Sequence, residues 1–248
     1  AVKGAPNSSD GGSRATAPTR ASGSDSCSSR RIVEFCCGKQ SRIGNLAPAG
    51  CDVVRLTVDD DLTTQAGLDK AIHYVTIPGI PTLLFGSLPC KGGSQYQHIN
   101  WQKGPGTREK IRQERAIFRA LWHNFVMVAE ACISNGGRIA FEWPRGCSYW
   151  HDEEVKSFMA RHALQTVKLD GCMYGLRSQA ARTSGALLRK PWTIATDCNE
   201  FRRLCRVCTH VATQHVKTQG SDTSLTEDYT DELVHDIHAC WHTACVPH

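Results

Sequence analysis

The sequence lacks any uninterrupted run of about 18–20 apolar residues, the length that an α-helix needs to cross a bilayer. The residues from Ala1 onward also lack the charged and then apolar pattern of a secretory signal. Charged residues make up 21% and hydrophobic residues 40% of the 248 residues, which is ordinary for a soluble globular protein. We therefore expect a protein without a membrane span, located inside the cell in the nucleus or the cytoplasm.

Cysteine, in contrast, is abundant. The chain has 13 cysteines, an odd number, and Cys36, Cys37 and Cys132 lie inside strongly apolar segments. Because the sequence shows no secretion signal, we expect reduced thiols rather than a disulfide framework. Most of these residues should be small buried hydrophobic side chains, which leaves a few for catalysis or metal binding.

Composition divides the chain into three parts. Residues 1–30 are rich in Ser, Gly, Ala, Pro and Thr and have no apolar period, which predicts a disordered tail. Residues 31–200 carry the apolar segments of one α/β domain. Residues 201–248 are predicted to form a small C-terminal appendage rich in Cys and His.

Strand-like and helix-like patterns alternate along residues 31–200. The predicted strands are 32–36, 52–57, 82–87, 138–143, 166–169 and 192–196, and the predicted helices are 65–75, 107–134, 152–162 and, in the last part, 231–243. Such alternation predicts right-handed crossovers and a mostly parallel, Rossmann-like sheet flanked by helices. Ligands bind such sheets at the carboxyl ends of the strands, so the residues after each strand are the first candidates for function.

The first two strands end in a turn and in an acidic step. Gly38, in the turn after residue 36, allows a close backbone approach to a ligand, although a tight strand–helix turn needs glycine for packing as well. Asp59 and Asp60 follow the second strand, where a carboxylate can accept hydrogen bonds from a ribose diol. The alternative for these two residues is a solvated acidic loop.

The third and fourth strands end near side chains that could take part in catalysis. Pro89 fixes the backbone before Cys90, and Lys91 is expected to lower the pKa of this thiol, as a nucleophile needs. Glu142 lies among apolar neighbours, which should raise its pKa and suit it to general acid catalysis. A structural cysteine, and a buried ion pair of Glu142 with Arg145 or Arg177, are the alternatives.

The motifs at these strand ends follow one another in the order found in a known protein family. The turn 34–44, the acidic step 59–61, the dipeptide Pro89-Cys90 and the strand end 142–144 resemble, in this order, the DNA cytosine-C5 methyltransferases and their S-adenosylmethionine-dependent relatives. The resemblance covers roughly residues 31–200. With the segments 99–100 and 205–215, the chain is also similar to methyltransferase-like regions of retroelement or viral polyproteins.

The resemblance implies a class I methyltransferase-like fold and a role for each motif. Cys90 would attack C6 of cytosine with help from Glu142, and Arg177 would complete the catalytic set. The residues implied for S-adenosylmethionine are Glu34, Cys36, Gly38, Ser41, Asp59, Asp60, Ser87 and Pro89. The first turn has fewer glycines than is usual in the family, and no sizeable segment after Arg177 suits target recognition. The alternative function is a catalytically inactive nucleic-acid-binding or protein-binding module.

Four ligand-type residues cluster near the C-terminus. Cys205, Cys208, His210 and His215 offer thiolate and imidazole groups that suit a tetrahedral zinc ion. The alternative is that the two cysteines lie on the apolar face of a helix beginning at Asn199.

The chain has a formal net charge of +5, a mild bias that suits a polyanionic partner, and the resemblance implies that this partner is nucleic acid, and DNA in particular. The basic stretch 108–115 is the candidate contact surface. Its alternative role is an ordinary solvated helix face.

Overall fold

The computed structural model describes residues 29–218 and 221–246. The predicted disordered tail, residues 1–30, lies outside the described part of the chain except for its last two residues, and Arg30 already begins the first strand.

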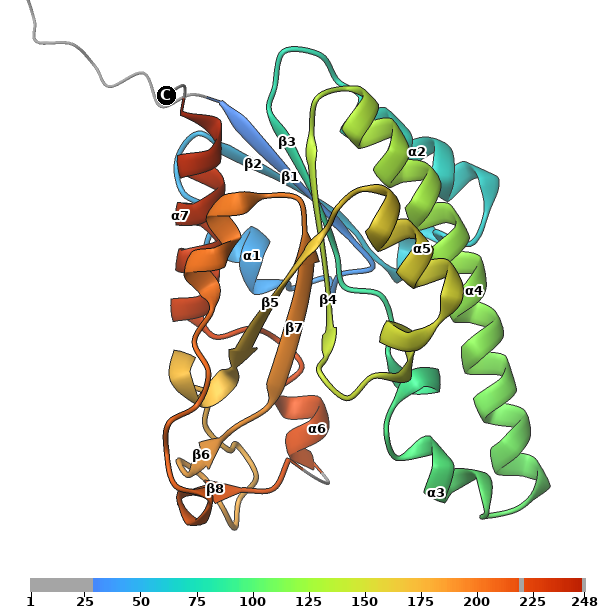
Figure 1. The fold of residues 1–248 in the computed structure, drawn as a ribbon, viewed down its shortest axis with the longest axis vertical. Helices are drawn as coiled ribbons and strands as arrows, with labels where there is room; N and C mark the ends of the chain where they lie inside the picture. The colour runs from blue at the N-terminus through green and yellow to red at the C-terminus, as the bar shows by residue number, and fades with distance from the viewer. Residues whose placement is uncertain (1–28, 219–220, 247–248) are drawn as a thin grey trace, which may run out of the picture.

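A six-stranded sheet organises the fold. Its order is β2-β1-β3-β4-β7-β5 (Figure 1). The strands are β1 (Arg30–Phe35), β2 (Cys51–Leu56), β3 (Thr82–Gly86), β4 (Arg138–Pro144), β5 (Gln165–Asp170) and β7 (Pro191–Thr196). The strands β2, β1, β3 and β4 are parallel, and β7 runs antiparallel to both β4 and β5. The predicted α/β, mostly parallel, Rossmann-like architecture is therefore confirmed.

Helices cover both faces of this sheet (Figure 1). The helices are α1 (Arg42–Asn45), α2 (Gln65–Val75), α3 (Gln97–Trp101), α4 (Pro105–Ser134), α5 (Glu153–Arg161), α6 (Ser221–Leu225) and α7 (Asp231–Cys245). Figure 1 shows α2, α4 and α5 on one face and α1 and α7 on the other. Two short strands, β6 (Leu187–Leu188) and β8 (His215–Val216), pair in parallel below the main sheet.

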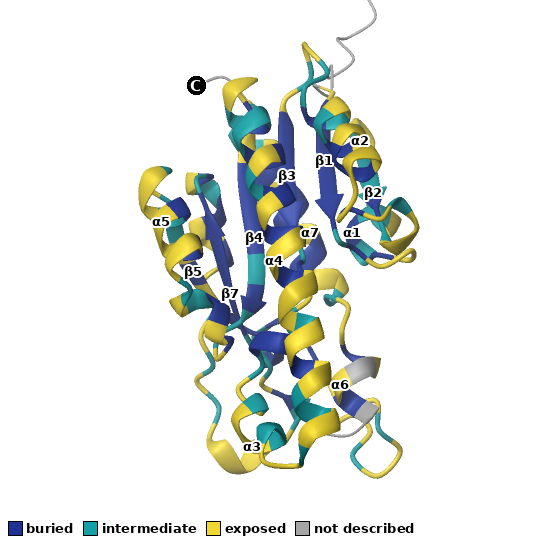
Figure 2. Ribbon diagram, turned by 90° about the vertical axis from the view of Figure 1, so that its right-hand side faces the viewer, coloured by how far each residue is buried: buried dark blue, intermediate teal, exposed yellow. Residues whose placement is uncertain are grey.

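The central strands are buried on both sides. Every residue of β1 and β3 is buried, which Figure 2 shows as uninterrupted dark blue. Their apolar sequences lack the alternation of a half-exposed strand because a parallel sheet packs helices on both faces. Near the start of β1, the Arg31 amide donates a hydrogen bond of 2.8 Å to the carbonyl of Pro81, the residue before β3.

Helix α4 supplies much of the core on one face. Its buried side is aromatic in the middle, where Trp122 and Phe125 meet Phe141 of β4 at ring-centroid distances of 5.3 and 5.7 Å. Gly86 is needed for this approach, because an added Cβ there would lie 2.7 Å from Phe125. The helix is long and apolar enough to span a membrane by composition alone, yet its apolar stripe lies in the core, as in soluble core helices.

Helix α7 closes the other face. Leu233, Val234 and Ile237 of α7 belong to one hydrophobic cluster with Ile32 and Phe85 of the sheet. The indole of Trp241 also donates a hydrogen bond to the Arg31 carbonyl at 3.0 Å. The segment 201–248, predicted as an appendage, thus contributes a helix to the main core. Its chain returns to the sheet because the apolar face of β1 and β3 requires cover.

We expect Phe125→Ala to lower the free energy of unfolding by about 3–5 kcal/mol, because Phe125 is fully buried and its loss leaves a cavity. Ile117→Ala is the matched control on the exposed side of the same helix and should cost less than about 1 kcal/mol. Urea unfolding followed by circular dichroism measures both values. Equal losses in the two variants would contradict the packing described for α4.

Candidate functional site

The strand order changes direction between β1 and β3. From β1 the chain moves outward to β2, and it then returns to place β3 on the opposite side of β1. In open α/β sheets a ligand crevice forms outside the carboxyl ends of the strands at such a point. The Ser87 amide donates to the Phe35 carbonyl at 2.9 Å and joins the two strand ends directly. The predicted residues after β1 and β3 therefore lie side by side.

The turn after β1 is built around a buried carboxyl group. Glu34 accepts a short hydrogen bond from the Ser41 hydroxyl, while its Oε2 atom has no hydrogen-bond partner. Burial raises the pKa of Glu34 to about 7, and the Ser41 hydrogen bond partly opposes this effect. Cys36 adopts a left-handed backbone conformation with φ of 64°, which turns the chain sharply after the strand. Glu34 and Ser41 are thus brought together.

Space remains open beside Gly38. An added Cβ at Gly38 would meet no atom within 4 Å, so this glycine is not required for packing against the protein. The helix that follows, α1, has only four residues and offers little dipole. Burial raises the pKa of Cys36 and of Cys37 to about 12, so both thiols stay protonated at neutral pH.

The two acidic residues after β2 differ in their contacts. Asp60 caps the short helix η1 (Val58–Asp60) by accepting from the Thr57 amide at 2.6 Å, and it also binds Lys70 at 2.5 Å. Hydrogen bonds from Lys70 and Thr57 lower its pKa against an opposing desolvation effect, which is the largest single contribution. Asp59 is exposed and contacts Lys39 of the first turn at 2.6 Å. The carboxylate of Asp59 therefore has fewer contacts within the protein than that of Asp60, which has a structural role.

Four polar side chains, those of Ser87, Glu142, Lys190 and Tyr229, meet near the ends of β3 and β4. Glu142 accepts a hydrogen bond from the Tyr229 hydroxyl at 2.9 Å, and the same hydroxyl lies 3.4 Å from the Ser87 hydroxyl. The Oε1 atom of Glu142 has no partner. Burial raises the pKa of Glu142 to about 7, while the Tyr229 hydrogen bond and the charge of Lys190 act in the opposite direction.

Two members of this group were not predicted as site residues. Tyr229 follows the polar loop before α7, and 87 residues separate it from Glu142. Lys190 precedes β7, and burial lowers its pKa. Its ammonium group donates to the Thr226 carbonyl, which ties Lys190 to the segment carrying Tyr229. The only sequence signal for Lys190 was its place directly before a strand, and Tyr229 gave none.

Cys90 does not have the lowered pKa that its neighbour Lys91 suggested. Burial raises the pKa of the Cys90 thiol to about 11, and the charge of Glu142 adds to the effect. The charge that opposes this rise comes from Lys190, not from Lys91. Cys90 and Glu142 are thus close enough for their charges to interact.

The loop around Cys90 is held by packing. The indole of Trp143 donates to the Leu88 carbonyl at 2.9 Å, and Pro89 is exposed beyond it. The glycines that follow Cys90 leave no open space beside the loop. An added Cβ would lie 2.5 Å from the Tyr149 hydroxyl at Gly92 and 2.8 Å from the Cys147 sulfur at Gly93.

The two arginines considered as partners of Glu142 have other contacts. Arg145 forms an ion pair with the buried Asp170 at 3.0 Å. Arg177 is exposed and donates to the Gly185 carbonyl at 2.9 Å. Its predicted place in the catalytic set with Cys90 and Glu142 gains no support from these contacts.

The predicted metal-ligand set changes by one residue. Cys172, Cys208, His210 and His215 place one ligand atom each within 4.8 Å of one another. Cys205 is exposed and lies outside this cluster, which corrects the CxxC pairing expected from the sequence. The segment from Asn199 is a short 3-10 helix, η5 (Asn199–Leu204), which ends before Cys205, so the alternative of one helix face carrying Cys205 and Cys208 is also wrong.

Two hollows on the described surface lie away from these residues. One is lined by Trp122, His123 and Phe158 between α4 and α5, and the other by Arg145, Trp150 and residues of β5 and β7. Neither contains a predicted catalytic or cofactor-binding residue. No protein-family model and no curated protein matches the chain.

We expect Glu142→Gln to stabilise the protein at about pH 8 and to change its stability little at about pH 4. The pKa of Glu142 is raised to about 7, so the folded state keeps a proton that the unfolded state releases above its ordinary pKa. The stability of the wild type therefore falls as pH rises through this interval, and the amide removes this loss.

Thermal unfolding at several pH values measures the difference between wild type and variant. Glu154→Gln, at an exposed position, serves as the control. If the difference in stability between wild type and Glu142→Gln did not change with pH, the raised pKa of Glu142 would not be its cause.

Proposed function

We propose that the protein is an S-adenosylmethionine-dependent methyltransferase that acts on nucleic acid, at C5 of cytosine, through Cys90. The observation that carries the proposal is the convergence of Cys90 and Glu142 at the carboxyl ends of the adjacent strands β3 and β4. They lie beside the point between β1 and β3 where a sheet of this type binds its ligand. The class I methyltransferase-like fold is part of this proposal.

The cofactor half of the proposed site is the β1 turn with the acidic step after β2. The open space beside Gly38 and the unpartnered Oε2 atom of Glu34 support a ligand at this turn. Asp59 is the residue we assign to the ribose, because the carboxylate of Asp60 is already engaged. When bound, S-adenosylmethionine would supply the electrophilic methyl group.

Glu142 suits the role of the acid. With a pKa of about 7 it carries a proton on a large fraction of molecules at neutral pH, and its Oε1 atom has no hydrogen-bond partner in the protein. Hydrogen bonding or proton donation to N3 of cytosine makes C6 more electrophilic, so that Cys90 can add there and C5 can take the methyl group, with the demethylated cofactor leaving as a thioether. Loss of the C5 proton to a base would then release Cys90 from C6 and restore the aromatic ring. Tyr229 holds the other oxygen and so orients the carboxyl group.

The nucleophile and the acid are electrostatically linked. A negative Glu142 raises the pKa of Cys90, and a neutral Glu142 no longer does so. The thiolate therefore forms more readily when Glu142 is protonated, which is the combination that attack on C6 requires. The charge of Lys190 favours the Cys90 thiolate, and it also favours the ionised form of Glu142.

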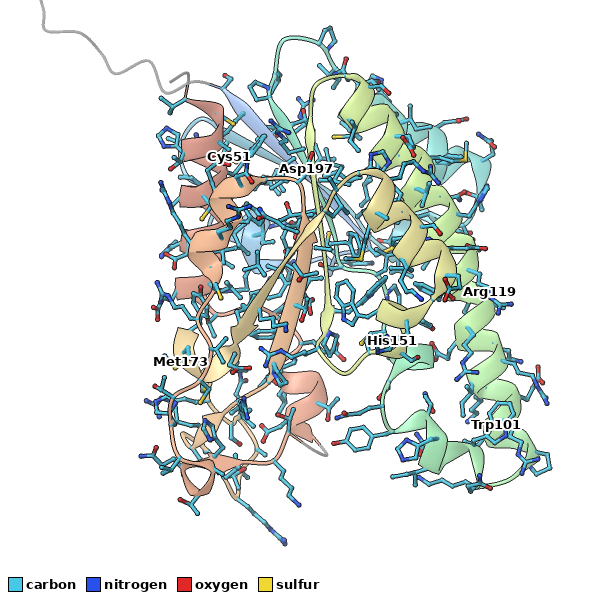
Figure 3. All side chains as sticks on the ribbon, viewed as in Figure 1. Cys51, Trp101, Arg119, His151, Met173 and Asp197 are labelled. Carbon is cyan, nitrogen blue, oxygen red and sulfur yellow. The ribbon has the colours of Figure 1, made fainter. Side chains whose placement is uncertain are left out.

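A basic projection next to Cys90 supports nucleic acid as the substrate. The chain from Lys91 to Arg119 contains Glu109 and Glu114 as its only acidic residues, against seven basic ones: Lys91, Lys103, Arg108, Lys110, Arg112, Arg115 and Arg119. This excess equals the +5 of the whole chain, so the rest is balanced. Trp101 and Arg119 mark the projection in Figure 3. Phosphates bound here would flank a base extruded toward Cys90.

The second candidate is a catalytically inactive nucleic-acid-binding module on the same fold. The observation that favours it is the pKa of about 11 at Cys90, which leaves little thiolate before a substrate binds. The basic projection would act alone in that case.

Titration with S-adenosylmethionine, followed by transfer of its labelled methyl group to cytosine-containing DNA and RNA, tests the proposal. We expect Cys90→Ser to bind the cofactor with nearly unchanged affinity and to lose methyl transfer by about 10³-fold or more, because a hydroxyl is a far weaker nucleophile than a thiolate. Cys205→Ser, at an exposed position, should keep full activity.

Full methyl transfer by Cys90→Ser would remove the C5 mechanism. A wild type that fails to bind the cofactor, yet binds nucleic acid in a salt-dependent way, would establish the second candidate instead.

The two neighbouring aspartates provide a second test. We expect Asp59→Asn to weaken cofactor binding by about tenfold without changing thermal stability, since only an exposed ion pair is lost. Asp60→Asn should instead lower the free energy of unfolding by about 1 kcal/mol, because it weakens a helix cap. Calorimetric titration and thermal unfolding of both variants measure these effects. The reverse pattern would assign the ribose contact to Asp60.

A further inference from the structure

The Cys172, Cys208, His210 and His215 side chains form a compact four-ligand cluster. The Cys208 sulfur lies 3.3 Å from Nδ1 of His210 and 3.4 Å from Nε2 of His215. In a tetrahedral zinc site, with bonds of about 2.3 Å to sulfur and about 2.0–2.1 Å to nitrogen, a sulfur and a nitrogen ligand are about 3.6 Å apart. The cluster therefore has nearly the spacing that one shared ion imposes.

The ligands come from two stretches of the chain, with Cys172 in one and Cys208, His210 and His215 close together in the other. Cys172 is buried in η4 (Gly171–Tyr174), directly after β5. Cys208 follows η5, and His215 begins β8. Such convergence of segments that are distant in the sequence is typical of a structural site, where the metal holds together a region with little core of its own.

The backbone around the cluster is held independently of any ion. The buried carboxylate of Asp170 accepts the Cys208 amide at 2.8 Å, and the Asp170 amide donates to the Arg206 carbonyl at 2.9 Å. Arg145 and Arg189 balance the charge of Asp170. This network fixes Cys208 next to Cys172, so the two thiols are placed for a common ligand before the metal binds.

The region around the cluster contributes Tyr174, Leu188 and Leu204 to the core, but its regular secondary structure is small. The sheet of β6 and β8 has two residues in each strand, which is marginal without further support. Val207 and Val211 are exposed by 45% and 63%, so the segment between the ligands buries little apolar surface. A metal ion would supply the missing cross-link.

We propose that Cys172, Cys208, His210 and His215 bind one structural zinc ion. Two thiolates and two imidazoles form a soft, closed set that favours zinc over harder cations such as magnesium or calcium. The site is independent of the methyltransferase proposal, because no ligand belongs to the residues assigned to cofactor or substrate. The exposed Cys205 is not a ligand.

Metal analysis of the purified full chain tests the assignment. Wild-type protein prepared under reducing conditions should carry about one equivalent of zinc. Cys172→Ser should lose it, whereas the matched control Cys205→Ser should retain it. Replacing zinc with cobalt should give the strong visible absorption of a tetrahedral site, with thiolate charge-transfer bands that weaken in Cys172→Ser.

A further variant guards against general misfolding. His210→Cys keeps four ligands and should retain the metal, with stronger thiolate bands in the cobalt form. Circular dichroism verifies the fold of each variant. Zinc loss in Cys205→Ser with retention in Cys172→Ser would restore the ligand set expected from the sequence and overturn the proposal. Wild-type protein that neither contains nor takes up zinc or cobalt would also overturn it, as would an oxidised Cys172–Cys208 pair in the reduced preparation.

Discussion

Burial of the central parallel strands on both faces is the constraint from which most of this structure follows. Strands β1 and β3 expose none of their side chains, so each face of the sheet needs an apolar cover. Helix α4 covers one face, and α7, at the other end of the described chain, covers the second. The return of the chain to form α7 also carries Tyr229 to the carboxyl end of β4, where it binds Glu142. A packing requirement thereby completes a polar site.

The same burial sets the chemistry of that site. Glu34 and Glu142 lie where desolvation raises the pKa of each carboxyl group to about 7, and each keeps one oxygen without a partner. Unpaired buried oxygens are costly, which makes these two carboxyl groups unusual in the described structure. The thiol of Cys90 experiences the same desolvation, and its ionisation depends on the protonation of Glu142. The ionisations of Cys90 and Glu142 are therefore coupled.

Two projections extend past the carboxyl edge of the sheet. One is the basic start of α4 with α3, where Arg108 and Arg112 lie over the Trp101 ring at 5.8 and 5.5 Å. The other contains β6, β8 and α6 and is joined to the sheet through Asp170 and Lys190 (Figure 1). The first has the charge to hold phosphates, and the second has the ligands to hold zinc. Their positions on either side of the strand ends are compatible with the proposed nucleic-acid substrate.

The sequence by itself determined the alternation of strands and helices, the long amphipathic helix α4, and the placing of Cys90 and Glu142 at strand ends. These features depend on local periodicity and on breakers such as Pro89, which act over a few residues. Tertiary structure alone decided the rest. It replaced Cys205 with Cys172 in the metal-ligand cluster, separated the roles of Asp59 and Asp60, and brought Tyr229 and Lys190 to Glu142. Each of these outcomes depends on contacts or burial created when distant segments pack together, and no local pattern of residues encodes them.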